Sequence, residues 1–213
     1  MEEKVKVHLD TLLTRYPQLD PCRESITRAY LYICSVFENG GKLLIVGNGG
    51  SAADAEHIVG ELMKAFKSPR TLSKEEQEAL LSIDPQDGKV LAQKLQGALP
   101  AIALDGHVAL TTAYMNDCEP LLCFAQQVNG YGREGDAFLG ISTSGNSKNV
   151  VYAAITAKAK GMKVIALTGA RDSRLSALAD VTIQVPETET YIIQELHLPV
   201  YHALCLMLEA HFF

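Results

Sequence analysis

The chain has 213 residues and a formal net charge of −6, with 47% hydrophobic and 21% charged residues. This length suits one substantial α/β domain with a full core, and the composition is ordinary for a globular protein. The negative charge argues against a surface that coats nucleic acid, and no apolar run approaches the roughly 18 residues that cross a membrane. Residues 1–4 are polar and lack the apolar segment of a signal peptide. We therefore expect a cytoplasmic protein with no nucleic-acid or membrane partner.

The five cysteines also indicate the cytoplasm. They are odd in number, form no CxxC pair, and are expected to be free thiols in a reducing compartment rather than a disulfide framework.

The first 40 residues predict a helical hairpin. Apolar residues at helical spacing favour a helix over residues 3–16, which ends before Pro17. Asp20-Pro21 is expected to open a second helix, because proline is tolerated at the first helical position. That helix stops at Gly40-Gly41. The hairpin precedes every predicted strand, so we expect it to pack on the sheet or on a partner subunit.

Short apolar runs predict the buried strands of a parallel sheet. They cover residues 42–46, 101–104, 137–141, 164–167 and 181–185. Helical patterns lie between or after them, over residues 52–66, 106–115, 119–130, 148–160, 173–179 and 190–213. Strands that alternate with helices are typical of a doubly wound α/β sheet, in which ligands bind beyond the carboxyl ends of the strands. We expect one domain over residues 1–213, ending in a long C-terminal helix.

Residues 67–98 interrupt this alternation. Turn residues fill 68–70 and 84–88, and between them Ser73 and Glu76 have the spacing of a capping box that begins a short charged helix. Residues 89–96 predict another short helix. We interpret the segment as a helical excursion on the rim of the site, where it could be a lid, a linker pair or a patch for a partner.

A hydroxyl-rich turn follows the strand at 137–141. Four hydroxyls, on Ser142, Thr143, Ser144 and Ser147, precede the helix that begins at residue 148. The free N–H groups and the dipole of a helix N-terminus favour an anion, and the hydroxyls add neutral donors, so the turn predicts a phosphate site. The alternative is a helix cap with Ser147 as N-cap, but capping needs one or two hydroxyls rather than four.

Other polar residues are candidates for catalysis or binding. His57 and Glu61 share one helix face, so they could bind one divalent metal, or the Glu61 carboxylate could be a base that the imidazole orients. The alternative is a solvent-exposed i,i+4 pair with no function. Asn116-Asp117 could bind ligand hydroxyls or simply end a helix. The final helix carries four further polar residues on or beside an apolar face, where a lone histidine is more often structural: Gln194, Glu195, His197 and His202.

Several motifs together resemble the sugar-isomerase (SIS) domain of phosphoheptose isomerases. They are the glycine turn 47–51 with Asp54, His57 and Glu61 behind it, and the segments 132–136, 140–147, 163–169 and 193–197. The resemblance covers nearly all of the chain except residues 67–98. It implies a flavodoxin-like SIS fold and a homo-oligomer, typically a tetramer, with active sites at subunit interfaces.

The resemblance also implies an activity, the isomerisation of sedoheptulose 7-phosphate to D-glycero-D-manno-heptose 7-phosphate through a cis-enediol, a step in heptose and lipopolysaccharide biosynthesis. It assigns Glu61 as the base and His202 as its acid–base partner. The remaining substrate contacts that it implies are Asn48, Gly49, Gly50, Ser51, Asn116, Asp117, Ser142, Thr143, Ser144, Ser147 and Gln194. The zinc ligands that it implies are His57, Glu61, Gln194 and His202.

Helix spacing constrains the implied zinc site. Gln194 and His202 are eight positions apart, which is roughly 12 Å along a straight helix, whereas zinc bonds are only about 2 Å long. Either the helix is distorted near Pro199, or the two ligands come from different subunits. We expect the second arrangement, and with it an obligate oligomer. The competing interpretation is a non-catalytic SIS protein that binds a phosphosugar or a replication-initiator protein; we favour the enzyme because such proteins lack residues that match Glu61 and His202.

Overall fold

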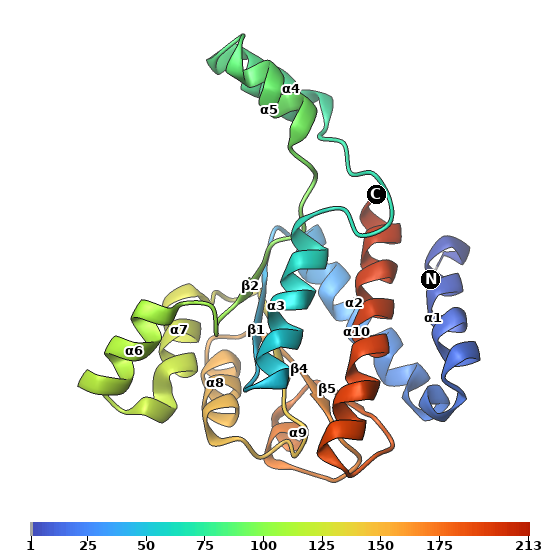
Figure 1. The fold of residues 1–213 in the computed structure, drawn as a ribbon, viewed down its shortest axis with the longest axis vertical. Coiled ribbons are helices and arrows are strands. Elements are labelled where there is room, and N and C mark those ends of the chain that lie inside the picture. The colour runs from blue at the N-terminus through green and yellow to red at the C-terminus, as the bar shows by residue number, and fades with distance from the viewer. Residues whose placement is uncertain (1) are drawn as a thin grey trace.

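Residues 2–213, the part of the chain that the computed structural model describes, form a parallel sheet covered by helices on both faces (Figure 1). Its strands are β1 (Leu43–Val46), β2 (Ala101–Ala103), β3 (Ala137–Ile141), β4 (Lys163–Thr168) and β5 (Val181–Gln184). Within this part of the chain the strand order is β2-β1-β3-β4-β5, and every pairing is parallel. The predicted doubly wound, flavodoxin-like sheet is therefore confirmed.

The side chains of β1 alternate between two apolar cores. Leu43 and Ile45 face the core built with α1 (Glu3–Arg15), α2 (Arg23–Glu38), α3 (Gly50–Met63) and α10 (Thr190–Phe212). Leu44 and Val46 face the core built with α7 (Cys123–Tyr131), α8 (Lys148–Ala159) and α9 (Arg174–Leu178). All four side chains are buried, as expected for a central parallel strand whose two faces are both covered by helices.

The chain enters α2 differently from the prediction. Residues Pro17–Cys22 form a 3-10 helix, and α2 begins at Arg23 rather than at Asp20-Pro21. Two prolines four positions apart, Pro17 and Pro21, each lack a backbone donor, which favours a short 3-10 turn over a regular first turn of α-helix. A second 3-10 helix, Pro120–Leu122, lies between α6 (Val108–Asp117) and α7.

The excursion forms an arm that projects from the body (Figure 1). It consists of α4 (Lys74–Ile83) and α5 (Asp87–Lys94), which pack against each other. The predicted capping box is confirmed, because the Glu76 N–H donates to Ser73 Oγ at 3.2 Å and the Ser73 N–H donates to Glu76 Oε2 at 2.9 Å. The arm leaves from the C-terminal end of α3, at the end of the body opposite to α9. Its predicted place on the rim of the site stays a prediction.

α10 is the longest helix in residues 2–213, and it runs without a break through Pro199. It packs along α3 and also contacts α1 and α2. α10 is therefore not interrupted at Pro199. No helix within the described residues is both long and apolar enough to cross a membrane.

Candidate active site

The hydroxyl loop, residues 142–147, lies where β3 ends and α8 begins. Ser142 is buried, and its Oγ lies 3.1 Å from Oγ of Ser147. Ser147 occupies the N-cap position of α8, yet among the described residues its side chain makes no capping hydrogen bond to the helix. The Ser147 hydroxyl therefore remains available to a ligand, which favours the phosphate-site interpretation over the capping one.

The first turn of α8, directly after the hydroxyl loop, meets the glycine loop, residues 47–51, which follows β1. The Asn48 and Asn149 side-chain amides donate to each other's Oδ1 atoms, at 3.0 and 2.8 Å. Gly49 has φ +57°, a left-handed conformation that side-chain-bearing residues seldom adopt. Because β1 and β3 are neighbouring strands on either side of the point where the winding reverses, the two loops form the edge at which ligands bind in this kind of sheet.

A cavity of about 250 Å³ borders the hydroxyl loop. Thr143, Ser144 and Asn146 line it, together with Arg171, which follows β4. Arg171 is a cation that the sequence analysis missed, although its place after the carboxyl end of a predicted strand was a usable signal. Carboxylates share the wall as well, on Asp172 and Glu187.

Gln194 lies at the glycine loop. A Cβ placed on Gly50 would come within 2.7 Å of the Gln194 Nε2, so the Gln194 amide lies directly against the start of α3. Ser51, the next residue, is buried. The glycine loop, the hydroxyl loop and Gln194 therefore form one end of the candidate site.

An acid–base cluster, formed by Asp54, His57, Glu61, Tyr201 and His202, lies further along α3 and α10. The Nε2 of His57 lies 3.2 Å from Glu61 Oε1, and its Nδ1 lies 3.0 Å from the Tyr201 hydroxyl. The His57 and His202 rings meet edge to face, with centroids 5.0 Å apart. The second carboxylate oxygen of Glu61 accepts a hydrogen bond from Lys64 Nζ at 3.0 Å.

Burial tunes the protonation of this cluster. It lowers the pKa of His202, and the nearby His57 lowers it further against the opposing charge of Glu61, so the imidazole favours its neutral form. Burial likewise raises the pKa of Asp54, partly offset by the Tyr201 hydrogen bond and by His57. The His202 Nε2 is buried and has no hydrogen-bond partner within residues 2–213. A neutral imidazole with an uncommitted nitrogen is suited to proton transfer or to metal binding.

The two ends of the site are far apart within one chain. Glu61 is eleven positions beyond Gly50 on α3, which is roughly 16 Å along the helix axis. Gln194 and His202 are separated by roughly 12 Å on the unbroken α10. Asn116 and Asp117 are exposed in the last turn of α6, where the Asn116 amide donates to Asp117 at 2.8 Å. The structure thus assembles two partial sites, and it does not bring Asn116 and Asp117 to either one.

Residues 88–169 match the family model for the SIS domain. The phosphoheptose isomerase of Rhodospirillum rubrum is 34% identical over 209 residues, which are 98% of this chain and 97% of that protein. The chain belongs to the phosphoheptose isomerase family. The family's protein from Aneurinibacillus thermoaerophilus is 38% identical over 84% of this chain and 77% of its own length.

Solved structures of the phosphoheptose isomerase family share this fold. The enzyme from Neisseria gonorrhoeae aligns with a TM-score of 0.73 and 32% identity, over 97% of each chain. The enzyme from Francisella tularensis aligns with a TM-score of 0.75 and 31% identity, over 97% of this chain and 96% of that one. The alignments span nearly the whole length of both partners, so the N-terminal helices and α10 belong to the shared fold as well as the sheet.

The phosphoheptose isomerase resemblance implied a zinc site, and the residues present fit one in part. His57, Glu61 and His202 supply nitrogen and oxygen donors of the kinds that zinc prefers, and His202 Nε2 is a buried donor without a partner in the described chain. Gln194, the fourth predicted ligand, is at the other end. No group of three His, Cys, Asp or Glu side chains within residues 2–213 is arranged to hold an ion in this single chain. Both nitrogens of His57 face protein groups, the Tyr201 hydroxyl and the Glu61 carboxylate.

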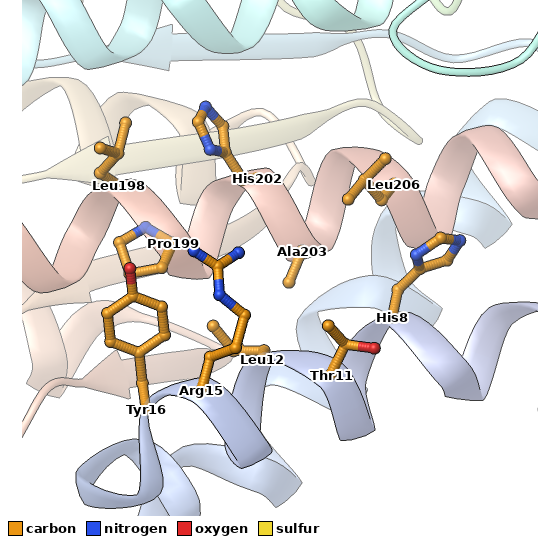
Figure 2. A pocket seen from close by; sticks show the side chains of 10 residues that line it. All are labelled: His8, Thr11, Leu12, Arg15, Tyr16, Leu198, Pro199, His202, Ala203 and Leu206. Carbon is orange, nitrogen blue, oxygen red and sulfur yellow. The ribbon is translucent and has the colours of Figure 1, made fainter.

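His202 also borders a groove on the other side of α10. This cavity of about 200 Å³ lies between α1 and α10, and Figure 2 shows Arg15 of α1 and Tyr16, the residue after it, beside Pro199, with His202 directed toward α3.

Proposed function

We propose that this protein is a phosphosugar ketose–aldose isomerase that converts sedoheptulose 7-phosphate to D-glycero-D-manno-heptose 7-phosphate. The observation that carries the proposal is the pairing of a hydroxyl-lined anion loop with a Glu61–His57–His202 cluster, in a member of the phosphoheptose isomerase family. The alternative of a non-catalytic SIS protein has no structural feature in its favour.

The hydroxyl loop would hold the substrate phosphate. Ser142, Thr143, Ser144 and Ser147 surround the free N–H groups at the start of α8, and both features favour an anion. Binding energy from the phosphate, which does not react, positions the far end of the sugar for chemistry. The glycine loop and Gln194 would contact the sugar hydroxyls beside it.

Glu61 and His202 would move the protons. The Glu61 carboxylate takes a proton from C1 of the ketose, giving a cis-enediol, and returns it to C2. His202 passes the hydroxyl proton from the C1 oxygen to the C2 oxygen, so that no atom is gained or lost. Burial lowers the pKa of His202 and so keeps its imidazole neutral. The neutral ring has an unpaired Nε2 that can accept a proton.

We further propose that zinc binds at the acid–base cluster. His57, Glu61 and His202 would hold the ion, with Gln194 supplied by a neighbouring subunit. A bound zinc ion supplies Lewis-acid polarisation of the substrate carbonyl. In the same way, the hydroxyl loop of one chain would lie next to Glu61 of another chain. We therefore propose a homo-oligomer, a tetramer as the resemblance implies. Asn116 and Asp117 would be contributed to the site across an interface.

Direct turnover tests this function. Purified protein is incubated with sedoheptulose 7-phosphate and with shorter ketose phosphates, with and without zinc, and the aldose product is resolved by chromatography. Glu61→Gln and His202→Ala should each abolish turnover, whereas Glu24→Gln, which alters an exposed carboxylate on α2, should not. Full activity in both cluster variants would overturn the mechanism. Absence of turnover with every sugar phosphate would favour the binding-protein alternative. We also expect this step to serve heptose and lipopolysaccharide synthesis in the cytoplasm.

A further inference from the structure

A buried ion pair lies at the C-terminal end of α3, beyond the proposed catalytic residues. The Nε of Arg70 lies 2.9 Å from Oε1 of Glu209, and the exposed fractions of the two side chains are 0% and 2%. Arg70 comes from the base of the arm and Glu209 from the last turns of α10. Neither residue contributes to the proposed chemistry or to substrate binding.

Glu209 holds the turn that follows α3. Its carboxylate accepts hydrogen bonds from the backbone N–H groups of Phe66, Lys67 and Ser68, at 2.8, 2.9 and 3.1 Å. Burial alone would raise the pKa of Glu209, but these donors and the Arg70 guanidinium together hold the pKa below its usual value. The carboxylate is therefore ionised and fully engaged.

Arg70 closes the end of α3 itself. Its NH1 donates to the backbone carbonyl of Leu62 at 2.7 Å, and its NH2 donates to the carbonyl of Glu61 at 2.8 Å. Carbonyls in the last turn of a helix have no intrahelical donor. The guanidinium supplies a donor to the Glu61 carbonyl and shares the Leu62 carbonyl with the backbone N–H of Leu99, which lies 3.0 Å away. The Phe213 ring covers the guanidinium, with its centroid 4.8 Å from Cζ.

We propose that Arg70, held by Glu209, is a positioning residue for the Glu61 carboxylate; the proposal rests on the catalytic role assigned to Glu61 above. The carboxylate itself is held only by His57 and Lys64 within residues 2–213, and their side chains are 41% and 60% exposed. Such exposed partners fix a side chain weakly. The backbone carbonyl of Glu61 is instead held by the Arg70 guanidinium. Its three donor nitrogens bond two carbonyls of α3 and the Glu209 carboxylate of α10.

The planar fork of arginine is what this arrangement requires. One guanidinium bonds Glu209, Leu62 and Glu61 in three different directions, whereas an ammonium is a single point on a flexible stem. A buried ion pair contributes little stability over an apolar pair of similar volume, so its distinctive effect is to specify geometry. A small displacement of a catalytic group lowers the rate of the chemical step more than it lowers substrate binding.

Arg70→Lys tests the inference, because lysine keeps the charge beside Glu209 but cannot supply the fork. In the full-length protein with sedoheptulose 7-phosphate, we expect kcat to fall by about 10-fold or more while KM stays within about twofold. Arg23→Lys is the matched control, because Arg23 pairs with Asp10 and Asp20 on the exposed surface. It should leave both constants unchanged.

Glu209→Gln provides a second variant, since its single amide oxygen can accept from only one of the two donor pairs, Lys67 and Ser68 or Phe66 and Arg70, while Arg70 keeps its bonds to Glu61 and Leu62. We expect a smaller fall in kcat, again with KM preserved. Folded Arg70→Lys with wild-type kcat would overturn the inference, as would an equal change in kcat and KM. Unfolding of both variants would also overturn it in favour of a purely structural pair. Glu61→Gln is assayed alongside: if it stays active, the proposed function has failed rather than the positioning role.

Discussion

Mixed oligomers test whether the two ends of the site come from different chains. One variant, Ser144→Ala with Ser147→Ala, removes two hydroxyls from the hydroxyl loop, and the other, Glu61→Gln, removes the base. Each hydrogen bond to a charged phosphate contributes about 1.5–3 kcal/mol, so the loop variant should lose about 10²- to 10⁴-fold in kcat/KM. Within one chain, Glu61 lies roughly 16 Å along α3 from the glycine loop.

Both variants are co-expressed in equal amounts with different tags and assayed with sedoheptulose 7-phosphate. If each site takes its loop from one chain and its base from another, about a quarter of the sites in random oligomers receive two intact parts, and about a quarter of wild-type activity should return. Glu61→Gln mixed with His202→Ala is the matched control, because these residues share one cluster in one chain. That mixture should stay inactive. Equal rescue in both mixtures, or none in either, would refute a site divided in this way.

Tyr201→Phe removes the hydroxyl that faces His57 Nδ1, and should lower kcat by about 10-fold at constant melting temperature, measured by steady-state kinetics beside thermal unfolding. Burial lowers the pKa of His197 to about 4, whereas the unfolded chain titrates near 6.5. The unfolded state therefore binds the proton first, and urea unfolding should show roughly 2 kcal/mol less stability at pH 5 than at pH 7, a slope that His197→Leu should flatten. Replacing residues 73–95 by a short glycine linker should change the melting temperature by only a few degrees, because α4 has no buried residue; a loss of folding would contradict this. Dialysis against a chelator should remove zinc, measured by elemental analysis, and His57→Ala should reduce zinc content even in excess metal.

The sequence predicted the sheet because each strand is a short, continuously apolar run bounded by turn residues. β3, for example, has every residue buried, and its carboxyl end coincides with the predicted hydroxyl loop. The capping box at Ser73 was predictable for a similar reason, since both of its hydrogen bonds are local. The start of α2 was not, because Pro17 and Pro21 permit either a first helical turn or a 3-10 turn. The direction of the arm could not be predicted from the local sequence either, because it depends on contacts between residues that are far apart in the chain.

The site residues were predictable as types, but their grouping was not. His57 and Glu61 share a helix face by spacing alone, and the structure places them together as expected. His202 joins them only because α10 packs against α3, which no local pattern reveals. The role of Glu209 was invisible for the same reason, since its partners lie about 140 positions away in the chain. Arg70 belongs to a segment whose sequence indicates turns, so its burial is decided wholly by tertiary contacts.

The packing of α3 against α10 explains why the site is divided. Gly50 faces Gln194 at the start of both helices, His57 faces Tyr201 two turns later, and the turn after α3 faces Glu209 beyond that. The two helices therefore advance together, and each pair of neighbours is carried further from the hydroxyl loop. Because α3 and α10 pack side by side in this register, Glu61 cannot reach a phosphate bound at the hydroxyl loop of its own chain. In the proposed oligomer a second chain supplies the missing half, and the proposed role of Arg70 is then to hold the base of one chain in place for a substrate whose phosphate is bound by a neighbour.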